Sequence, residues 1–357
     1  MRTSQTKVEH LYVHVPFCAA KCNYCAFYSE AGNADKMSGY VDAVLLELEH
    51  FAPQLAPTTI FFGGGTPSLL PAPLMRRILE KIPATHATEW TIECNPSTVS
   101  TEKAKLFRES GVNRISMGVQ SLDDELLDVI GRVHSVKAAV ESYRKLRDAG
   151  FDNINLDLMF GLPGQTMEHW RNTLAKAIEL QPEHLSTYGL ILEEDTEFWR
   201  MFGKGLIKPD EELELAMYQT GMEVLAAAGY RQYEISNFSK PGKECRHNIA
   251  YWEGKDYLGL GPSACSTVGS KRWQNSAQIE NWAVCFEENL TAELRAAERA
   301  AFGMRMNAGV PAELVRGRWD KQIAELLSAE LVQWRNGRLA PTARGILFAD
   351  EIASAFV

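Results

Sequence analysis

The chain has 357 residues, of which 45% are hydrophobic and 23% charged, a composition typical of a soluble protein that buries a core. Its 37 Lys and Arg residues against 46 Asp and Glu residues leave a net charge of −9, and the absence of a basic run argues against nucleic acid as a partner. No apolar stretch approaches the ~18 residues that a membrane-spanning helix needs. Residues 1–9 are polar and lack the apolar core of a signal peptide. We therefore expect a cytoplasmic protein without an integral membrane segment.

Short β-branched runs alternate with amphipathic helical patterns over the first two thirds of the chain. Strands are predicted at residues 11–15, 58–62, 90–94, 114–119, 153–159, 184–191 and 233–236. The predicted helices between them include residues 38–50, where Val41, Val44, Leu45 and Leu48 share one face. Strand–helix units in series require a parallel sheet with right-handed crossovers. We predict an α/β fold with a partial parallel barrel of the (β/α)6 type, and ligand chemistry at the loops that follow the carboxyl ends of the strands.

The pattern changes after residue 239. Residues 240–291 are rich in Gly, aromatic and polar residues, which is typical of a loop-rich connecting segment. From residue 292 onward, short helices precede a hairpin-like strand pair at residues 331–339 with a turn at Asn336-Gly337, and a closing helix follows from about residue 343. We predict a core domain at residues 1–239, a connecting segment at 240–291 and a small winged-helix-like domain at 292–357.

Three of the seven cysteines lie close together in the sequence. Cys18, Cys22 and Cys25 follow the first predicted strand, at a spacing that lets one loop place three thiolates at three corners of a [4Fe–4S] cubane. Such a cluster normally has four thiolate ligands, so the fourth iron would be open to an exchangeable ligand. The alternative is a structural zinc site completed by His14 or Cys265. Zinc sites of this kind usually combine two short-spaced pairs of ligands, and the sequence has no second pair, so the cluster is favoured.

The Cys-x3-Cys-x2-Cys spacing, followed by Gly64-Gly65-Thr66-Pro67 at a later strand end, resembles the radical S-adenosylmethionine superfamily. In that family the amino and carboxylate groups of the nucleotide's methionine part chelate the open iron. One electron from the cluster then cleaves the sulfonium C–S bond and yields a 5′-deoxyadenosyl radical. The resemblance thus implies a [4Fe–4S] cluster and S-adenosylmethionine as cofactors, with the protein orienting them.

Further motifs narrow this resemblance. They are Tyr-x-His-x-Pro-Phe-Cys at 12–18, Gly-Val-Gln-Ser at 118–121, Gly-Arg-x-His at 131–134 and Asn-Leu-Asp-Leu-Met-x-Gly-Leu-Pro at 155–163. Over nearly the whole chain, the combination is similar to the oxygen-independent coproporphyrinogen III oxidase-like family. Taken singly, each position has a structural alternative, such as a tight turn or an ion pair. Together, the resemblance and the glycine-rich turn imply that the nucleotide is bound by Tyr12, Tyr24, Gly64, Gly65, Thr66, Glu93, Gln120, Arg132 and Asp157.

Two functions from different classes fit this family. One is an oxidase that decarboxylates porphyrinogen propionates by radical chemistry. The other is a heme chaperone that keeps the same scaffold, binds heme and passes it to an acceptor protein. Phe27 stands where the family's oxidase has a further cysteine, and the chain reaches Tyr12 without the oxidase's N-terminal extension. The sequence His-Asn-Ile-Ala-Tyr-Trp at 247–252 matches the pattern of the family's chaperone branch, so we expect the chaperone and judge oxidase activity the less favoured alternative.

The chemistry of residues 247–252 suits heme. Imidazole is a common axial ligand of heme iron, and Tyr and Trp offer flat apolar surfaces to a porphyrin. We predict heme binding by His247, Asn248, Tyr251 and Trp252, with Cys245 as a second candidate ligand. The structural alternative is a hydrogen-bonded His247 and a Trp252 that packs a domain junction. Heme and an acceptor protein are the expected partners, a homodimer is left open, and no residue is assigned a catalytic role.

Overall fold

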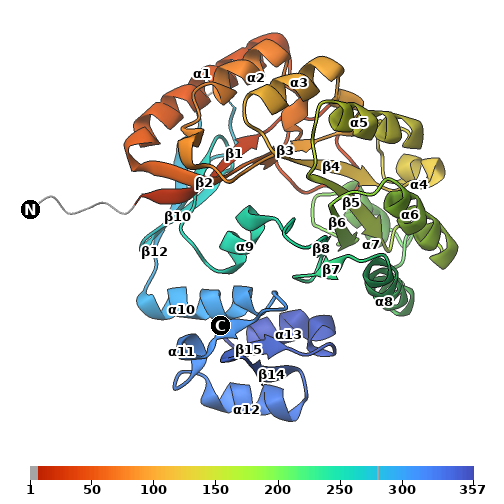
Figure 1. Cartoon of the computed structure of the whole chain (residues 1–357), viewed down its shortest axis with the longest axis vertical. Coiled ribbons are helices and arrows are strands. Elements are labelled where there is room, and N and C mark those ends of the chain that lie inside the picture. The colour runs from red at the N-terminus through yellow and green to blue at the C-terminus, as the bar shows by residue number, and fades with distance from the viewer. Residues whose placement is uncertain (1–6, 280) are drawn as a thin grey trace, which may run out of the picture.

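The computed structural model describes residues 7–279 and 281–357 (Figure 1). Its main feature is a nine-stranded sheet with the order β7-β8-β6-β5-β4-β3-β2-β1-β9. The parallel strands in the middle of the sheet are β1 (Val8–Val15), β2 (Leu55–Gly64), β3 (Glu89–Cys94), β4 (Arg114–Gln120), β5 (Ile154–Phe160) and β6 (His184–Gly189). The predicted α/β fold with a partial parallel barrel is therefore confirmed. The edge strands β7 (Arg231–Gln232) and β9 (Leu258–Leu260) lie at opposite ends of the strand order.

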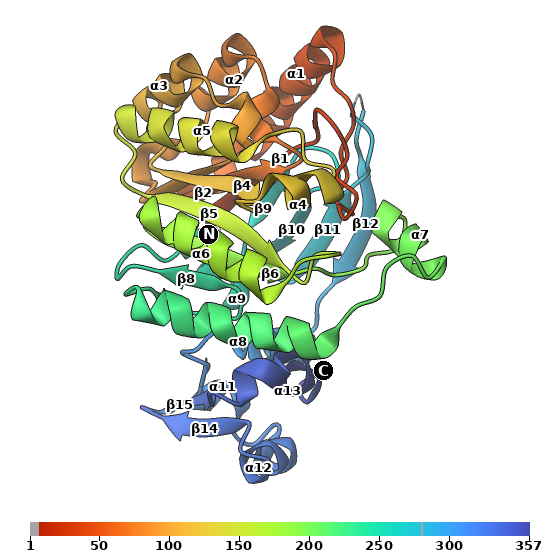
Figure 2. The same cartoon turned by 90° about the vertical axis from the view of Figure 1, so that its right-hand side faces the viewer.

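Helices connect these strands and cover the convex face of the sheet (Figures 1 and 2). They are α1 (Ala34–Phe51), α2 (Ala72–Leu79), α3 (Thr101–Glu109), α5 (Val136–Asp148), α6 (Met167–Glu179) and α8 (Glu211–Ala227). In α1, the side chains of Val41, Val44 and Leu48 are buried in the main core, as the helical spacing predicts. The short helices α4 (Asp124–Val129) and α7 (Glu197–Gly203) lie in the loops that follow β4 and β6.

The concave face of the sheet carries buried polar side chains, whereas the helices that connect the strands cover the other face. Asn155 on β5 donates to Ser116 on β4 at 2.7 Å and to Asp157 at 2.8 Å. His184 on β6 lies 2.6 Å from the side-chain oxygen of the same asparagine. A buried polar network of this kind is stable only when its members are hydrogen-bonded. The concave side of the barrel is therefore the surface suited to a polar ligand.

The segment that follows β6 and α8 contains more regular structure than its sequence suggests. It holds β8 (Asn237–Ser239), α9 (Arg246–Trp252), β10 (Cys265–Val268), β11 (Lys271–Asn275) and β12 (Val284–Asn289). The predicted strand at 233–236 is wrong, because Glu234 accepts the amide of Ser236 at 3.1 Å and turns the chain between β7 and β8. Strand β9 pairs with β1 and extends the main sheet, whereas β10, β11 and β12 form a second, antiparallel sheet.

The C-terminal part has its own apolar cluster, which includes Leu326, Leu339 and Phe356. Its elements are α10 (Ala292–Gly303), β13 (Val310–Pro311), α11 (Ala312–Val315), α12 (Asp320–Ser328), β14 (Val332–Arg335), β15 (Arg338–Pro341) and α13 (Ala349–Ser354). The predicted hairpin is confirmed, and its turn has φ of 50° at Asn336 and 73° at Gly337. The predicted closing helix starts later than expected, at Ala349. No helix among the described residues is long and apolar enough to cross a membrane.

Candidate functional site

A cavity of about 490 Å³ opens at the carboxyl ends of the parallel strands. Loops that are far apart in the sequence meet there, as expected for a parallel sheet. Its wall contains all three clustered cysteines. It also contains the predicted nucleotide-binding residues Tyr24, Gly64, Gly65, Thr66, Glu93, Gln120, Arg132 and Asp157. Tyr12 is not part of the wall: its hydroxyl lies 3.1 Å from Nδ1 of His14, and its ring packs beside Gly63.

The cysteine loop is held to three other segments of the chain by backbone and side-chain hydrogen bonds. The amide of Cys18 donates to the carbonyl of Glu30 at 3.1 Å. The side chain of Asn23 donates to the carbonyl of Val129 at 2.9 Å, and the backbone carbonyl of Asn23 accepts the amide of Phe198 at 2.9 Å. These hydrogen bonds hold the loop at Cys18, where it begins, and at Asn23, in its middle. The partners of Asn23 are Val129 in α4 and Phe198 in α7. This arrangement presents the three thiols to the cavity.

The groups around the thiols are hydrogen-bond donors. Arg132 donates from Nη1 to Sγ of Cys22 at 3.4 Å and from Nη2 to the carbonyl of Gly118 at 2.5 Å. The hydroxyl of Thr66 lies 3.6 Å from Sγ of Cys18. A guanidinium and a hydroxyl stabilise thiolate sulfur by charge-assisted and neutral hydrogen bonds. Three partly exposed thiols, two of them with such partners, fit the three-cysteine side of a [4Fe–4S] cluster.

The predicted partners of a zinc site lie elsewhere. His14 uses both ring nitrogens, Nδ1 with the Tyr12 hydroxyl at 3.1 Å and Nε2 with the carbonyl of Tyr28 at 3.3 Å. Cys265 is on β10 and does not contribute to the cavity wall. Over residues 7–279 and 281–357, no three His, Cys, Asp or Glu side chains are gathered closely enough for one metal ion. Neither candidate therefore completes a tetrahedral site with the cysteine loop.

The glycine-rich turn after β2 is shaped by contact with the chain around β1. Gly64 has φ of 103°, and a Cβ there would lie 2.5 Å from the ring of His14. A Cβ on Gly65 would lie 2.8 Å from the backbone oxygen of Phe17, next to the cysteine loop. The amide of Gly65 also donates to the carbonyl of Val15 at 2.8 Å. The glycines are thus required for the turn to pack against the segment that leads into the cysteine loop.

Two carboxyl groups face the same cavity. Burial, followed by the neighbouring charge of Asp157, raises the pKa of Glu93 to about 8. Burial also raises the pKa of Asp157, whose oxygens accept hydrogen bonds from Ser116 at 3.2 Å and Asn155 at 2.8 Å. A bound ammonium would reverse part of this desolvation cost by supplying an opposite charge. The pair is therefore chemically suited to a ligand with ammonium or hydroxyl donors.

Gln120 enters the cavity through an irregular strand end. The register between β4 and β5 shifts between Gly118 and Gln120, and Gln120 has φ of 68°. This left-handed conformation is uncommon for residues other than glycine, and it is found at turns and functional sites. A Cβ on Gly118 would lie 3.0 Å from Nε2 of Gln120. The bulge thus turns the side chain of Gln120 past Gly118, toward the face of the sheet that lines the cavity.

Sequence reasoning missed several residues of the cavity. Tyr188 and Ser116 line it, and their positions near the carboxyl ends of β6 and β4 were the available signal. The exposed apolar residues Val133 and Ile191 also line it, with exposed fractions of 54% and 68%. Val133 is the unspecified position of the Gly-Arg-x-His motif and Ile191 belongs to no motif, and apolar residues in a sequence are normally interpreted as core.

The predicted heme segment lies at the opposite ends of the strands from the cysteine loop. Helix α9 lies between the main sheet and the C-terminal part (Figure 1). Glu89, the first residue of β3, accepts the amides of Arg246 at 2.8 Å and His247 at 2.9 Å. The ring of His247 stacks on Phe61 with centroids 5.2 Å apart, and its Nδ1 lies 2.8 Å from the hydroxyl of Thr59. The histidine is thereby held at the amino-terminal end of the barrel.

The other predicted heme residues of this segment pack against different neighbours from those of His247. The ring of Tyr251 stacks on Phe302 of α10 with centroids 5.9 Å apart, and Cζ of Arg305 lies 4.8 Å from the ring centroid of Trp252. Cys245 is buried, and burial raises the pKa of its thiol to about 12. The structure therefore places His247 against the barrel, and Tyr251 and Trp252 against the C-terminal part, rather than all of them in one cavity with the cysteines.

Comparisons with known proteins identify the family of the chain. The sequence model of the Radical SAM superfamily matches residues 12–177 of this chain. Membership of this superfamily implies a [4Fe–4S] cluster and S-adenosylmethionine. The chain is 34% identical to the heme chaperone HemW of Bacillus subtilis (strain 168), over 97% of this chain and 98% of the relative. It is 40% identical to the heme chaperone HemW of Escherichia coli (strain K12), over 72% of this chain and 70% of the relative.

A solved structure is also similar over almost the full length. The coproporphyrinogen III oxidase HemN of Escherichia coli, described as a radical SAM enzyme, superimposes with a TM-score of 0.84 at 25% identity. The match covers 99% of this chain and 91% of the oxidase. The oxidase shares the fold, whereas several relatives of higher sequence identity are heme chaperones. The chain therefore belongs to the HemW family within the radical S-adenosylmethionine superfamily.

Proposed function

We propose that this protein is a heme chaperone, which binds heme and transfers it to an acceptor protein. The observation that carries the proposal is the position of His247, on a helix fixed to the barrel by Glu89 and Thr59. The similarity to relatives named heme chaperone HemW supports it. The alternative, oxidative decarboxylation of a porphyrinogen, is less well supported, because Phe27 replaces the further cysteine of the family's oxidase and is 69% exposed.

His247 has the properties of an axial ligand. Burial, followed by the nearby His10 and Arg114, lowers its pKa to about 3, so the imidazole is neutral at physiological pH. Its Nδ1 is paired with the Thr59 hydroxyl, and within the described residues its Nε2 has no hydrogen-bond partner. Metal-binding histidines commonly use one ring nitrogen for the metal and the other for a fixed hydrogen bond. We assign heme iron to Nε2 of His247, and keep Asn248, Tyr251 and Trp252 as further heme-binding candidates.

The cysteine cavity is the proposed cofactor site. Cys18, Cys22 and Cys25 would hold the cluster, and Arg132 would stabilise the Cys22 sulfur by the hydrogen bond it already makes. When bound, the cluster supplies one electron for cleavage of the sulfonium C–S bond. Glu93 and Asp157 would accept hydrogen bonds from the amino N–H groups or the ribose hydroxyls of S-adenosylmethionine from the cavity wall. Tyr12 would act indirectly, since it lies behind this wall.

The proposed partners are heme and a protein acceptor, and the proposed location is the cytoplasm. We also propose the division into residues 1–239, 240–291 and 292–357. The separate apolar cluster of the C-terminal part supports its independence. The pairing of β9 with β1 ties the middle segment closely to the core.

The test uses full-length protein with its cluster reconstituted anaerobically. One half of the sample is titrated with heme, and the other is incubated with coproporphyrinogen III, S-adenosylmethionine and a reductant. We expect saturable heme binding and no decarboxylated product, with the oxidase of Escherichia coli as a positive control. Conversion of coproporphyrinogen to protoporphyrinogen would overturn the chaperone proposal in favour of the oxidase.

A further inference from the structure

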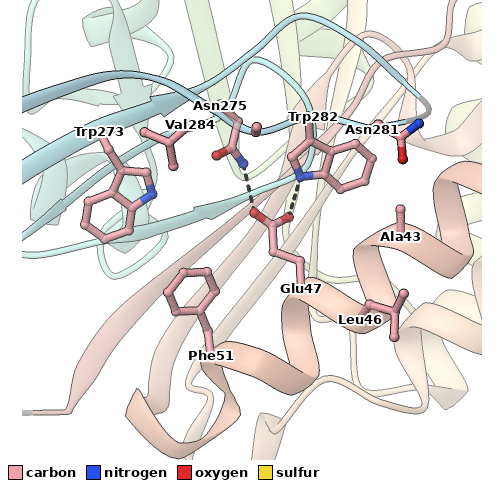
Figure 3. Close-up of a pocket in the computed structure, with 10 residues that line it drawn as sticks. Ala43, Leu46, Glu47, Phe51, Trp273, Asn275, Asn281, Trp282 and Val284 are labelled. Carbon is pink, nitrogen blue, oxygen red and sulfur yellow. Dashed lines mark hydrogen bonds between the residues drawn. The ribbon is translucent and has the colours of Figure 1, made fainter.

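A second cavity, of about 320 Å³, lies on the outside of the barrel between α1 and the β11–β12 hairpin. None of the predicted cofactor or heme residues lines it. Figure 3 shows Trp273 and Phe51 on one side of Glu47, with Trp282 and Leu46 on the other. Three aromatic rings thus surround a carboxylate at the surface of the molecule. Leu46, on the rim, is 69% exposed.

The carboxylate of Glu47 accepts several hydrogen bonds but forms no ion pair with a described Lys or Arg side chain. It accepts the amide of Gly261 at 2.8 Å, the side-chain amide of Asn275 at 2.8 Å and the indole Nε1–H of Trp282 at 3.0 Å. In the described chain, neither lysine nor arginine forms an ion pair with Glu47. Burial raises the pKa of this carboxyl, with His50 as a minor opposing charge. A carboxylate in this position would be stabilised further by a cationic ligand.

An unpaired sheet edge begins at the same cavity. Strand β12 pairs with β11 only, so its outer backbone groups are free within the described sheet. Val284, its first residue, lines the cavity and is 52% exposed, and Phe286 further along is 48% exposed. A free edge with exposed apolar side chains is the surface to which an extended peptide can add a strand.

We propose that this cavity binds the guanidinium or ammonium group of a basic side chain, carried by an extended segment of a partner protein that pairs along β12. Trp273, Trp282 and Phe51 line the cavity, and aromatic walls of this kind favour a cationic side chain. Glu47 supplies the opposite charge, and β12 supplies backbone partners. Charge complementarity selects a basic segment, since the chain itself carries a net charge of −9. This proposal is independent of the cluster and of heme.

The test follows the Trp282 indole by NMR, because its N–H donates to Glu47 and senses any cation that arrives there. Full-length protein is titrated with the peptide acetyl-TVRVT-amide and with a twin in which citrulline, a neutral isostere, replaces arginine. We expect the arginine peptide to shift this signal saturably and to bind about tenfold more tightly than its twin. Equal affinities of the two peptides, or no shift with either, would overturn the proposal. Methylguanidinium alone should bind more weakly, and equal binding would refute the contribution of the strand edge.

Two variants locate the binding. Glu47→Gln keeps the size of the side chain and removes its charge, so the preference for arginine over citrulline should disappear. Because this change also disturbs three hydrogen bonds, Ala43→Leu serves as a second variant that fills the cavity from α1 without altering them. We expect Ala43→Leu to weaken the arginine peptide about tenfold. Unchanged binding in a folded Ala43→Leu protein would place the peptide elsewhere and contradict the proposal.

Discussion

The carboxylate of Glu89 accepts the backbone amide of His247 at 2.9 Å, although the two residues are 158 positions apart in the sequence. Glu89 begins β3, and His247 lies in the first turn of α9, so this contact fixes the predicted heme helix to the barrel. The same carboxylate accepts the amide of Arg246 at 2.8 Å. A negative charge at a helix amino terminus satisfies free N–H groups and is favourable for the helix dipole.

Removing the Glu89 carboxylate should therefore loosen α9. Glu89 is 4% exposed, and a hydrogen bond to a charged group contributes about 1.5–3 kcal/mol. We expect Glu89→Ala to lower the free energy of unfolding in urea by about 3 kcal/mol and to weaken heme binding. The matched control is Glu253→Gln at the other end of α9, where an exposed pairing with Lys255 should contribute less than about 1 kcal/mol. Equal effects of the two changes would contradict the anchoring role of Glu89.

The identity of the cluster ligands can be tested with two cysteines of the same cavity. Cys22→Ala removes one of three clustered thiols and should abolish the visible absorption of the reconstituted cluster. Cys94 also lines the cavity, but it is buried, and burial raises the pKa of its thiol to about 12. A thiol that resists ionisation is a poor ligand, so Cys94→Ala should retain the cluster. Iron and sulfide analysis checks both variants, and loss of the cluster in Cys94→Ala would show that a fourth thiolate is used.

Binding of S-adenosylmethionine should depend on pH through Glu93. Because burial and Asp157 raise its pKa to about 8, this carboxyl is mostly protonated at pH 7 and becomes ionised as the pH rises. The N–H and hydroxyl donors of the ligand make stronger hydrogen bonds to the ionised carboxylate, so affinity should increase between pH 6.5 and 8, by at most about tenfold per pH unit. Equilibrium dialysis over this range measures it. Glu93→Gln should remove the Glu93 part of the slope, and an identical profile in that variant would exclude Glu93 from the binding site.

The turn after β2 should not tolerate a side chain at Gly65. A Cβ there would lie 2.8 Å from the backbone oxygen of Phe17, so Gly65→Ala must displace the segment that enters the cysteine loop. We expect a lower unfolding midpoint and poor cluster reconstitution. Gly39 in α1 is the control, because a Cβ there meets no atom within 4 Å, and Gly39→Ala should stabilise the helix by about 0.5–1 kcal/mol. A fully reconstituted Gly65→Ala protein would show that the turn has more freedom than the structure indicates.

The parts of the structure that the sequence predicts best are those with long periodic patterns. The strands β1 to β6 are buried runs of six to ten residues, so both their existence and their parallel order could be predicted. Polar residues at their carboxyl ends, such as Glu93 and Asp157, were predicted to share one site, and they line one cavity because parallel strands bring those ends together. Helix α9 has seven residues and β9 three, which is too short for a periodic pattern to be recognised.

Most features that the sequence could not predict depend on contacts between residues far apart in the chain. Glu89 resembles any polar residue at the start of a strand, and only the fold shows that it holds α9. Thr59 is likewise one β-branched residue in a strand, yet its hydroxyl lies 2.8 Å from His247. The separation of His247 from Tyr251 and Trp252 also depends on packing against α10, which no local motif records.

The most direct measurement concerns the iron ligand of bound heme. Resonance Raman spectra of heme-loaded wild-type protein should show axial imidazole, because the neutral ring of His247 presents its Nε2 for coordination. In His247→Ala this signature should be lost while the cluster absorption is retained, and added imidazole should restore it by occupying the vacated position. His86→Ala, which changes an exposed histidine in another loop, should leave the spectrum unchanged. An imidazole signature that persists in His247→Ala without added imidazole would contradict the assignment of heme to α9.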